Sequence, residues 1–142
     1  MADFNQALID DLRAHHGEAS GGHFKGRPML ILTTTGAKTN ELRTAPLTYS
    51  RDGDRYVIVA SKGGAPNNPA WYHNLKAHPG LKAEVGGQAF EARATVVDEP
   101  ERRRLYDQHA ASHTGLGFKE YESKTTRVIP VIVLDREASA SD

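Results

Sequence analysis

The sequence predicts a small barrel of the α+β class, mainly β, with helices inserted between antiparallel strands. Two hairpin signals support this class, Asp52-Gly53 and Gly86-Gly87, each flanked by runs that favour strands. The helical patterns are few and do not alternate regularly with strands, which disfavours βαβ units. At 142 residues the chain has the length of one domain, so any cofactor and substrate would share one scaffold.

The first predicted element is a short amphipathic helix, in which Phe4, Leu8 and Leu12 recur every four residues. It should end before Gly17, because the glycine-rich segment that follows is typical of a mobile lead-in. The expected organisation has three parts: the N-terminal helix with its lead-in (1–27), a barrel domain (28–136) and a disordered tail (137–142).

Three strands are predicted next. The apolar, β-branched run 29–35 is the first, and the run 42–51 is the second. Asp52-Gly53 then turns the chain back through 56–60. We expect these three strands to form a meander.

A second helix is predicted from Pro69 to about residue 77, because Asn68 and Pro69 fit an N-cap followed by proline at the first helical position. Trp71 and Asn74 then share one face of this helix, three residues apart. After it, the runs 81–85 and 88–97 flank Gly86-Gly87 as a second hairpin.

The last two predicted elements are a helix and a strand. Asp98 and Pro100 open a helix that continues through about residue 111. The final strand is the run 128–134, which contains Pro130. Because proline has no N–H to donate to a ladder, we expect this strand to lie at an edge or to carry a bulge.

Composition excludes several classes of function. Eighteen basic residues against eighteen acidic ones give zero formal net charge, so neither nucleic acid nor a membrane surface is an expected partner. The absence of cysteine removes thiolate catalysis and cysteine-ligated metals. No signal peptide or membrane-spanning run is visible in the sequence. We therefore expect a cytoplasmic location.

Familiar catalytic motifs are also missing. The run 35–39 lacks the first glycine and the Gly-Lys pair of a phosphate loop, and no Gly-x-Gly-x-x-Gly follows a strand. His109 and His113 stand four residues apart, but no acidic residue completes a zinc motif between them. We expect surface histidines and no metal. Ser61 lacks the surroundings of a nucleophilic serine.

The remaining signal is a set of cations and glycines near predicted strand ends. Lys38 and Arg43 flank the connection between the first two strands, and Lys62 with Gly63 and Gly64 follows the third. Lysine, the arginine fork and glycine-turn amides are the donors that hold a phosphate. Trp71 would add an apolar wall for a ring. The alternative is that these cations are solvated turn residues and that Trp71 is a core anchor.

The order and spacing of several motifs carry a family resemblance. These motifs are Gly36-Ala37-Lys38-Thr39, Arg43-Thr44-Ala45-Pro46-Leu47, Ala60-Ser61-Lys62-Gly63-Gly64, Asn68-Pro69-Ala70-Trp71-Tyr72-His73-Asn74-Leu75 and the closing Thr126-Arg127-Val128-Ile129-Pro130-Val131. Together they resemble the deazaflavin-dependent nitroreductase and quinone reductase family of actinobacteria, over about residues 27–136.

The resemblance implies a split β-barrel, similar to flavin reductases and pyridoxamine-phosphate oxidases, that binds coenzyme F420. This cofactor is an 8-hydroxy-5-deazaflavin with a phosphate and a glutamate tail. The residues implied to bind it are Lys38, Arg43, Thr44, Pro46, Ala60, Ser61, Lys62, Gly63, Ala70, Trp71 and Asn74. The implied activity is hydride transfer from the reduced cofactor to a small-molecule acceptor: a quinone, a nitro compound or a conjugated enone.

The acceptor side departs from the family pattern. Members similar to this chain have a tyrosine-rich segment before the last strand, whereas the matching run 115–121 keeps only Tyr121 as a tyrosine. Phe118 and Lys124 stand where such members have aromatic residues with polar groups. Tyr121 and Ser61 are therefore the candidates for hydrogen-bonding the acceptor or relaying a proton.

Two other functions fit the same phosphate site. One is a non-catalytic protein that binds or stores the deazaflavin. The other is an FMN-binding oxidoreductase of the split-barrel type, since FMN also ends in a phosphate. The sequence leaves a monomer and a homodimer open, because no long apolar stripe is visible, and it slightly favours a monomer.

Overall fold

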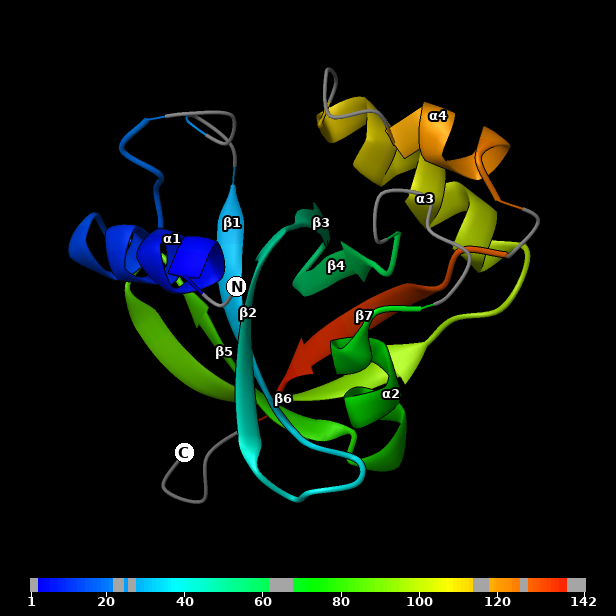
Figure 1. The fold of residues 1–142 in the computed structure, drawn as a ribbon. Coiled ribbons are helices and arrows are strands. Elements are labelled where there is room, and N and C mark those ends of the chain that lie inside the picture. Colours follow the sequence, from blue (N-terminus) through cyan, green and yellow to red (C-terminus); the bar gives the residue numbers. More distant parts are fainter. Residues whose placement is uncertain are drawn as a thin grey trace.

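A single curled antiparallel sheet forms the centre of the computed structural model, which describes residues 3–21, 25, 28–61, 68–113, 118–125 and 128–137 (Figure 1). Its strand order is β2-β1-β5-β6-β7-β4-β3. The strands are β1 (Met29–Thr35), β2 (Leu42–Thr48), β3 (Ser50–Asp52), β4 (Arg55–Val59), β5 (Gly80–Val85), β6 (Gln88–Val96) and β7 (Val131–Arg136). The helices are α1 (Asp3–Ala14), α2 (Ala70–Ala77), α3 (Glu101–Ser112) and α4 (Phe118–Ser123).

The connection between β2 and β3 makes the sheet a barrel. These strands stand at the two ends of the hydrogen-bonded order, yet only Tyr49 separates them along the chain. The two ends of the sheet therefore meet at Tyr49, which requires the sheet to curl on itself. The predicted α+β barrel is confirmed.

The predicted single strand over 42–51, and with it the three-strand meander, is wrong. The chain bends at Tyr49, so that β2 pairs with β1 and β3 pairs with β4. A strand that passes a barrel corner has to change partners, and such corners are made by bends. The sequence shows no turn residue there, because the bend is imposed by the curvature of the sheet.

The final strand also differs from its prediction. β7 lies between β6 and β4, so it is central and not an edge strand. It begins at Val131, directly after Pro130, which therefore needs no N–H for the ladder. The carbonyl of Pro130 accepts a hydrogen bond from the N–H of Ala60 at 3.0 Å. The proline thus caps the strand and does not interrupt it.

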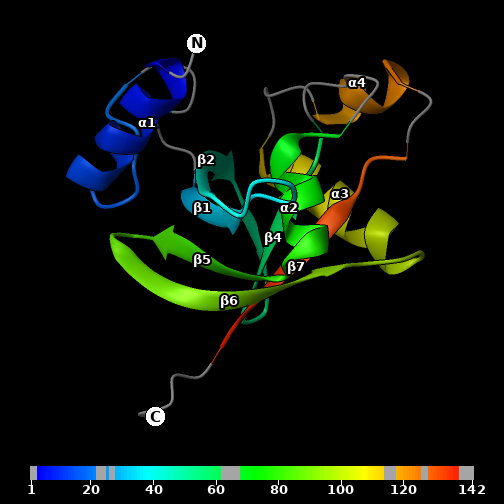
Figure 2. The same cartoon turned by 60° about the horizontal axis from the view of Figure 1, so that its bottom comes forward.

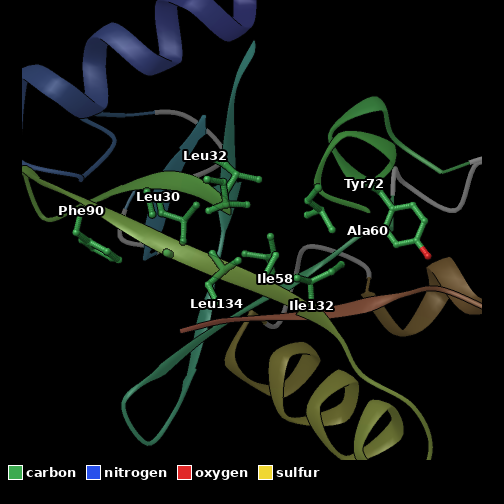
Figure 3. Close-up of a cluster of buried hydrophobic side chains, with 13 residues drawn as sticks. Leu30, Leu32, Ile58, Ala60, Tyr72, Phe90, Ile132 and Leu134 are labelled. Atoms are coloured by element: carbon green, nitrogen blue, oxygen red, sulfur yellow. The ribbon is translucent and has the colours of Figure 1, made fainter. Parts of the chain in front are cut away.

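The barrel interior is filled by side chains from β1, β4, β5, β6, β7 and α2. Figure 3 shows this cluster, with Leu32 on β1, Ile58 on β4 and Leu134 on β7 between Phe90 and Tyr72. Leu32, Ile58 and Leu134 are completely buried. Burying a side chain of this kind stabilises the fold by roughly 1.5–3 kcal/mol.

Alternate residues on the same strands face outward and are covered by helices. On β1, Met29 and Ile31 pack under Ile9 and Leu12 of α1. Because successive side chains of a strand point to opposite faces, both faces of β1 are buried. This double burial explains why the strand reads as a continuous apolar run in the sequence.

The outer faces of β4 and β7 are covered in the same way by α3 and α4. Val57 of β4 and Val133 of β7 pack with Leu105 and Tyr106 of α3. In Figures 1 and 2, α1 lies at one side of the sheet and the α3–α4 pair at the other. The three helices predicted from sequence are confirmed, whereas α4 was not predicted.

Two expectations at element ends need comment. The N-cap of α2 is Pro69, which has extended backbone angles, and not Asn68. The tail 138–142 and residues 22–24, 26 and 27 of the lead-in lie outside the described residues, so the three-part division of the chain stays a prediction. Among the described helices, none has the length and apolar content needed to cross a bilayer.

Candidate functional site

A cavity of about 710 Å³ opens between the β1–β2 turn and helix α2. Sites for small organic ligands commonly enclose roughly 300–1,000 Å³. The described residues that line it are Thr34, Gly36, Ala37, Lys38, Thr39, Arg43, Thr44, Ala45, Ala70, Trp71, His73 and Asn74.

The β1–β2 turn forms one wall of the cavity and is held by its own backbone. The N–H of Gly36 donates to the carbonyl of Glu41 at 2.7 Å, and the N–H of Asn40 donates to the carbonyl of Gly36 at 2.9 Å. Asn40 adopts a positive φ of 60°, which asparagine tolerates better than most residues. A Cβ at Gly36 would lie 2.5 Å from Thr39 Oγ1 and 3.2 Å from the carbonyl oxygen of Glu41, so a larger residue would force the Thr39 side chain to move.

The two cations of this wall are exposed at the cavity. Lys38 lies in the turn, and Arg43 follows on β2. Arg43 Nη1 stands 3.3 Å from Glu41 Oε1, with more than half of each side chain exposed. An exposed ion pair of this kind contributes at most about 1 kcal/mol. The guanidinium can therefore exchange Glu41 for an anionic ligand at little cost.

Helix α2 supplies the opposite wall. Ala70, Trp71 and Asn74 line the cavity, because positions three and four residues apart lie on one helical face. The predicted shared face of Trp71 and Asn74 is thus confirmed. Trp71 is half-buried and packs against the interior cluster, so its indole is both a core contact and part of the cavity wall.

Asn74 joins the two walls. Its side-chain Oδ1 accepts a hydrogen bond from the N–H of Ala37 at 3.0 Å, and its Nδ2 donates to Thr34 Oγ1 at 3.2 Å. Asn74 is only 8% exposed. Its amide therefore connects α2 to β1 and to the turn that carries Lys38.

The predicted site residues fall into three groups. Those in the cavity lining are Lys38, Arg43, Thr44, Ala70, Trp71 and Asn74. Those placed by the structure but absent from the described lining are Pro46, Ala60, Ser61 and Tyr121. Lys62 and Gly63 lie outside the described residues.

The four residues outside the described lining have other surroundings. Pro46 is half-buried on β2, opposite Ile31 in the ladder. Ala60 and Ser61 are buried after the end of β4. Tyr121 is on α4, where its ring contacts Phe118 edge to face at 5.3 Å.

Sequence reasoning missed six of the lining residues as ligand contacts: Thr34, Gly36, Ala37, Thr39, Ala45 and His73. His73 had a usable signal, because it follows Ala70 by three positions and so shares the helical face already assigned to the site. The other residues are small, and the sequence alone does not show which small residues face a cavity.

His109 and His113 are not surface residues, which corrects the prediction from sequence. Both are buried beside the β2–β3 corner, with ring centroids 4.7 Å apart. His109 Nδ1 lies 3.0 Å from Ser50 Oγ, and His113 Nε2 lies 2.8 Å from the carbonyl oxygen of Tyr49. These polar partners belong to a distant part of the chain, so the helix sequence by itself does not reveal them.

Burial controls the protonation of His109. Removal from water, followed by the nearby His113, lowers the pKa of His109 to about 3. The imidazole ring is therefore neutral at pH 7 and hydrogen-bonds to Ser50 at the β2–β3 corner. Within the described part of the chain, no group of three or more histidines and acidic residues converges as a metal site would require.

The chemistry of the cavity lining suits one kind of ligand. Two cations lie on the β1–β2 wall, and alanines and an indole line the walls between which a ring would sit. Charge-assisted hydrogen bonds to an anion contribute about 1.5–3 kcal/mol each. The donors present thus fit an elongated molecule with a planar ring and a phosphate, such as a deazaflavin.

Comparisons with known proteins agree with this arrangement. The model of the F420H(2)-dependent quinone reductase family matches residues 7–136. A protein of Mycobacterium tuberculosis strain H37Rv, named F420H(2)-dependent quinone reductase, is 50% identical over 111 residues, which cover 77% of this chain and 74% of that protein.

Solved structures give the same result. A structure named F420-H2 dependent reductase has a TM-score of 0.69 at 34% identity, covering 81% of this chain and 100% of its own. Another, described as a domain-swapped dimer, has a TM-score of 0.71 at 31% identity, covering 94% and 98%. Split-barrel structures at 12–13% identity, of the pyridoxamine-phosphate-oxidase type among others, share the fold alone. The split β-barrel implied by the family resemblance is confirmed.

Proposed function

The chain belongs to the F420H(2)-dependent quinone reductase family, and we propose that it transfers a hydride from reduced coenzyme F420 to a quinone. The cofactor expected from the sequence, coenzyme F420, is confirmed by this membership. Nitro compounds and conjugated enones are proposed as further acceptors, because they too accept a hydride at an electron-poor atom.

The observation that carries the proposal is the convergence of Lys38, Arg43 and Trp71 on one cavity. We assign Lys38 and Arg43 to the phosphate and the acidic tail of the cofactor. Trp71 and the alanines beside it would pack against the ring and exclude water. When bound, the reduced cofactor supplies the hydride, so the protein has to bind, orient and protonate and needs no nucleophile.

The source of the proton stays a proposal. Ser61 and Tyr121 are the candidates for hydrogen-bonding the acceptor or delivering a proton to its oxygen. Ser61 lies between the end of β4 and residues 62–67, which are outside the described residues. Tyr121 lies on α4. We also propose, from the family resemblance, four further cofactor contacts: Pro46, Ala60, Lys62 and Gly63.

The state of assembly and the location of the protein are also proposals. A homodimer gains support from the relative whose structure is described as a domain-swapped dimer, and a monomer is the alternative. A cytoplasmic location stays a prediction.

The proposal is tested by titrating the purified protein with oxidised coenzyme F420 and following fluorescence, with FMN and NADP as comparison ligands. Menadione is then added to the complex with the reduced cofactor. We expect selective micromolar binding of coenzyme F420 and reoxidation by menadione.

Each other outcome has a definite meaning. Binding without reoxidation by menadione, nitro compounds or enones would favour the deazaflavin-binding or storage function. Preferential binding of FMN would favour the FMN-type oxidoreductase. Failure to bind any of the three ligands would overturn the proposed site.

A further inference from the structure

We propose that Asn74 is a positioning residue that sets the place of Lys38 in the cavity, and not a contact of the cofactor ring or phosphate. This inference rests on the proposed function. It assigns to Asn74 a role different from the cofactor contact that the family resemblance implied. Three observations lead to it: the use of both ends of its amide, its burial, and the place of its partners in the fold.

The hydrogen bonds of the side-chain amide are directed to the protein. Oδ1 accepts from the N–H of Ala37, and Nδ2 donates to Thr34 Oγ1. Thr34 is 1% exposed and Asn74 is 8% exposed. A buried amide whose oxygen and nitrogen both have protein partners would lose a hydrogen bond by turning toward a ligand.

The hydrogen-bond partners of Asn74 lie in the part of the chain that sets the position of Lys38. Ala37 is the residue before Lys38, and Thr34 is at the end of β1, from which the turn departs. In Figure 2 the β1–β2 turn lies beside α2, in agreement with these hydrogen bonds. Asn74 therefore holds the turn at two points: where the turn leaves β1, and at the residue directly before Lys38.

The turn itself is rigid, so the hydrogen bonds of the Asn74 amide can position the whole turn. Two backbone hydrogen bonds close it between Gly36, Asn40 and Glu41. Beyond the packing of α2 against β1, the hydrogen bonds that the structure describes between this segment and α2 are those of the Asn74 amide. Without that amide, the turn could shift as a unit relative to Trp71, and a shift of about 1 Å is enough to weaken a charge-assisted contact.

The test is a double-mutant cycle on cofactor affinity, with Lys38→Ala and Asn74→Ala. Oxidised coenzyme F420 is the probe, and equilibrium fluorescence gives the dissociation constant without turnover. Lys38→Ala should weaken binding about tenfold in the wild-type background. In the Asn74→Ala background the same change should weaken it less than about threefold, because the lysine is already displaced.

Salt dependence gives a second readout that a merely structural role would not change. Screening weakens the contribution of an exposed cation to binding an anion. Asn74→Ala should therefore reduce the salt dependence of the dissociation constant to nearly that of Lys38→Ala. An unchanged salt dependence would contradict the inference.

Ser50→Ala is the matched control, since it also removes a buried side-chain hydrogen bond, to His109 at 3.0 Å, away from the cavity. It should lower stability without changing cofactor affinity. If Asn74→Ala does not fold, Thr34→Val replaces it in the cycle, because it removes the hydroxyl that anchors Nδ2 and nearly keeps the side-chain shape.

The outcomes separate this inference from the proposed function. An equal effect of Lys38→Ala in both backgrounds would overturn the positioning role of Asn74 and leave the anion site intact. No effect of Lys38→Ala in the wild-type background would overturn the anion site, and the inference with it.

Discussion

The cavity lining and helix α3 both carry arginine or lysine side chains, but these cations differ in how they are paired with carboxylates. On α3, Arg102 pairs with Glu99 at 2.8 Å and Arg103 pairs with Glu122 at 2.7 Å. At the cavity, Lys38 has no ion pair among the described residues, and Arg43 has one exposed partner at 3.3 Å. The difference teaches that a cation marks a binding site when carboxylates are scarce around it.

The pKa values of the carboxylates show the same contrast. Hydrogen bonds from Arg104 and then Arg55 hold the pKa of Asp52 below its usual value, and Arg102 does the same for Glu99. These pairs join α3 to the β3–β4 hairpin and to Glu99, which precedes the N-cap of α3. The charges of α3 thus act within the fold, whereas the cavity cations stay exposed, in agreement with their proposed role in binding a ligand.

The largest effect is expected from replacing both cavity cations. Lys38→Ala combined with Arg43→Ala should weaken binding of coenzyme F420 at least tenfold, because two charge-assisted contacts are lost together. Fluorescence titration measures it. The matched control is Arg103→Ala with Arg104→Ala, which removes two cations from α3 and should leave affinity unchanged. Unchanged affinity in a folded variant that lacks both Lys38 and Arg43 would contradict the claim that the cavity cations, unlike those of α3, bind the cofactor.

Arg102 tests the other side of the comparison. Its side chain is 8% exposed and donates to the carbonyl of Ile129 at 3.1 Å. Arg102→Ala should lower the free energy of unfolding by about 1–3 kcal/mol, because it leaves a buried carbonyl unpaired. Urea denaturation measures this. We expect no change in the cofactor affinity of the folded variant, and a parallel loss of affinity would mean that the two regions are coupled.

The pH dependence of stability should come from the α3 side. Because the pKa of His109 is lowered to about 3 in the folded protein, the unfolded state takes up a proton first as pH falls below about 6.5. The stability from its neutral form is therefore present above that pH and is lost on acidification. Between pH 6.5 and 5 the loss should be about 1.5 kcal/mol.

Denaturation curves across this range give the measurement. His109→Gln should reduce the slope of stability against pH, whereas His73→Gln, at the exposed cavity position, should leave the slope as it is. Equal slopes in the wild type and in His109→Gln would show that the buried ring does not set the acid sensitivity.

The smallest and most selective effect is expected at Tyr121, which lies on the α3–α4 side but is a candidate for the reaction. Tyr121→Phe should slow turnover with menadione several-fold and leave the dissociation constant of coenzyme F420 unchanged. Stopped-flow reoxidation and titration separate the two. Equal losses of affinity and turnover would make Tyr121 a structural residue, which would sharpen the division between the two regions.

Sequence reasoning succeeded where the signal is local. The strand 29–35, the hairpin at Gly86-Gly87 and the helix after Pro69 were predicted close to their observed bounds. Alternation, glycine turns and proline at a helix start act over a few residues, so the chain displays them directly. The motif spacing also predicted that Lys38, Arg43 and Trp71 lie together, and all three line one cavity.

Sequence reasoning failed where partners come from distant parts of the chain. The bend at Tyr49 follows from closure of the barrel, and the central place of β7 follows from pairing with β4 and β6. His109 and His113 were expected at the surface, yet Ser50 and Tyr49 supply their hydrogen bonds. No window of sequence contains both sides of these contacts.

The sequence by itself determined the class of fold, most of its elements and the residue types of an anion site, because local propensity and motif spacing are written along the chain. The tertiary structure decided which cations stay exposed at the cavity and which are paired with carboxylates of neighbouring elements. It also decided that both ends of the Asn74 amide are used by β1 and its turn. The physical reason is that burial and partner geometry depend on which distant segments meet, and that is fixed only when the sheet closes.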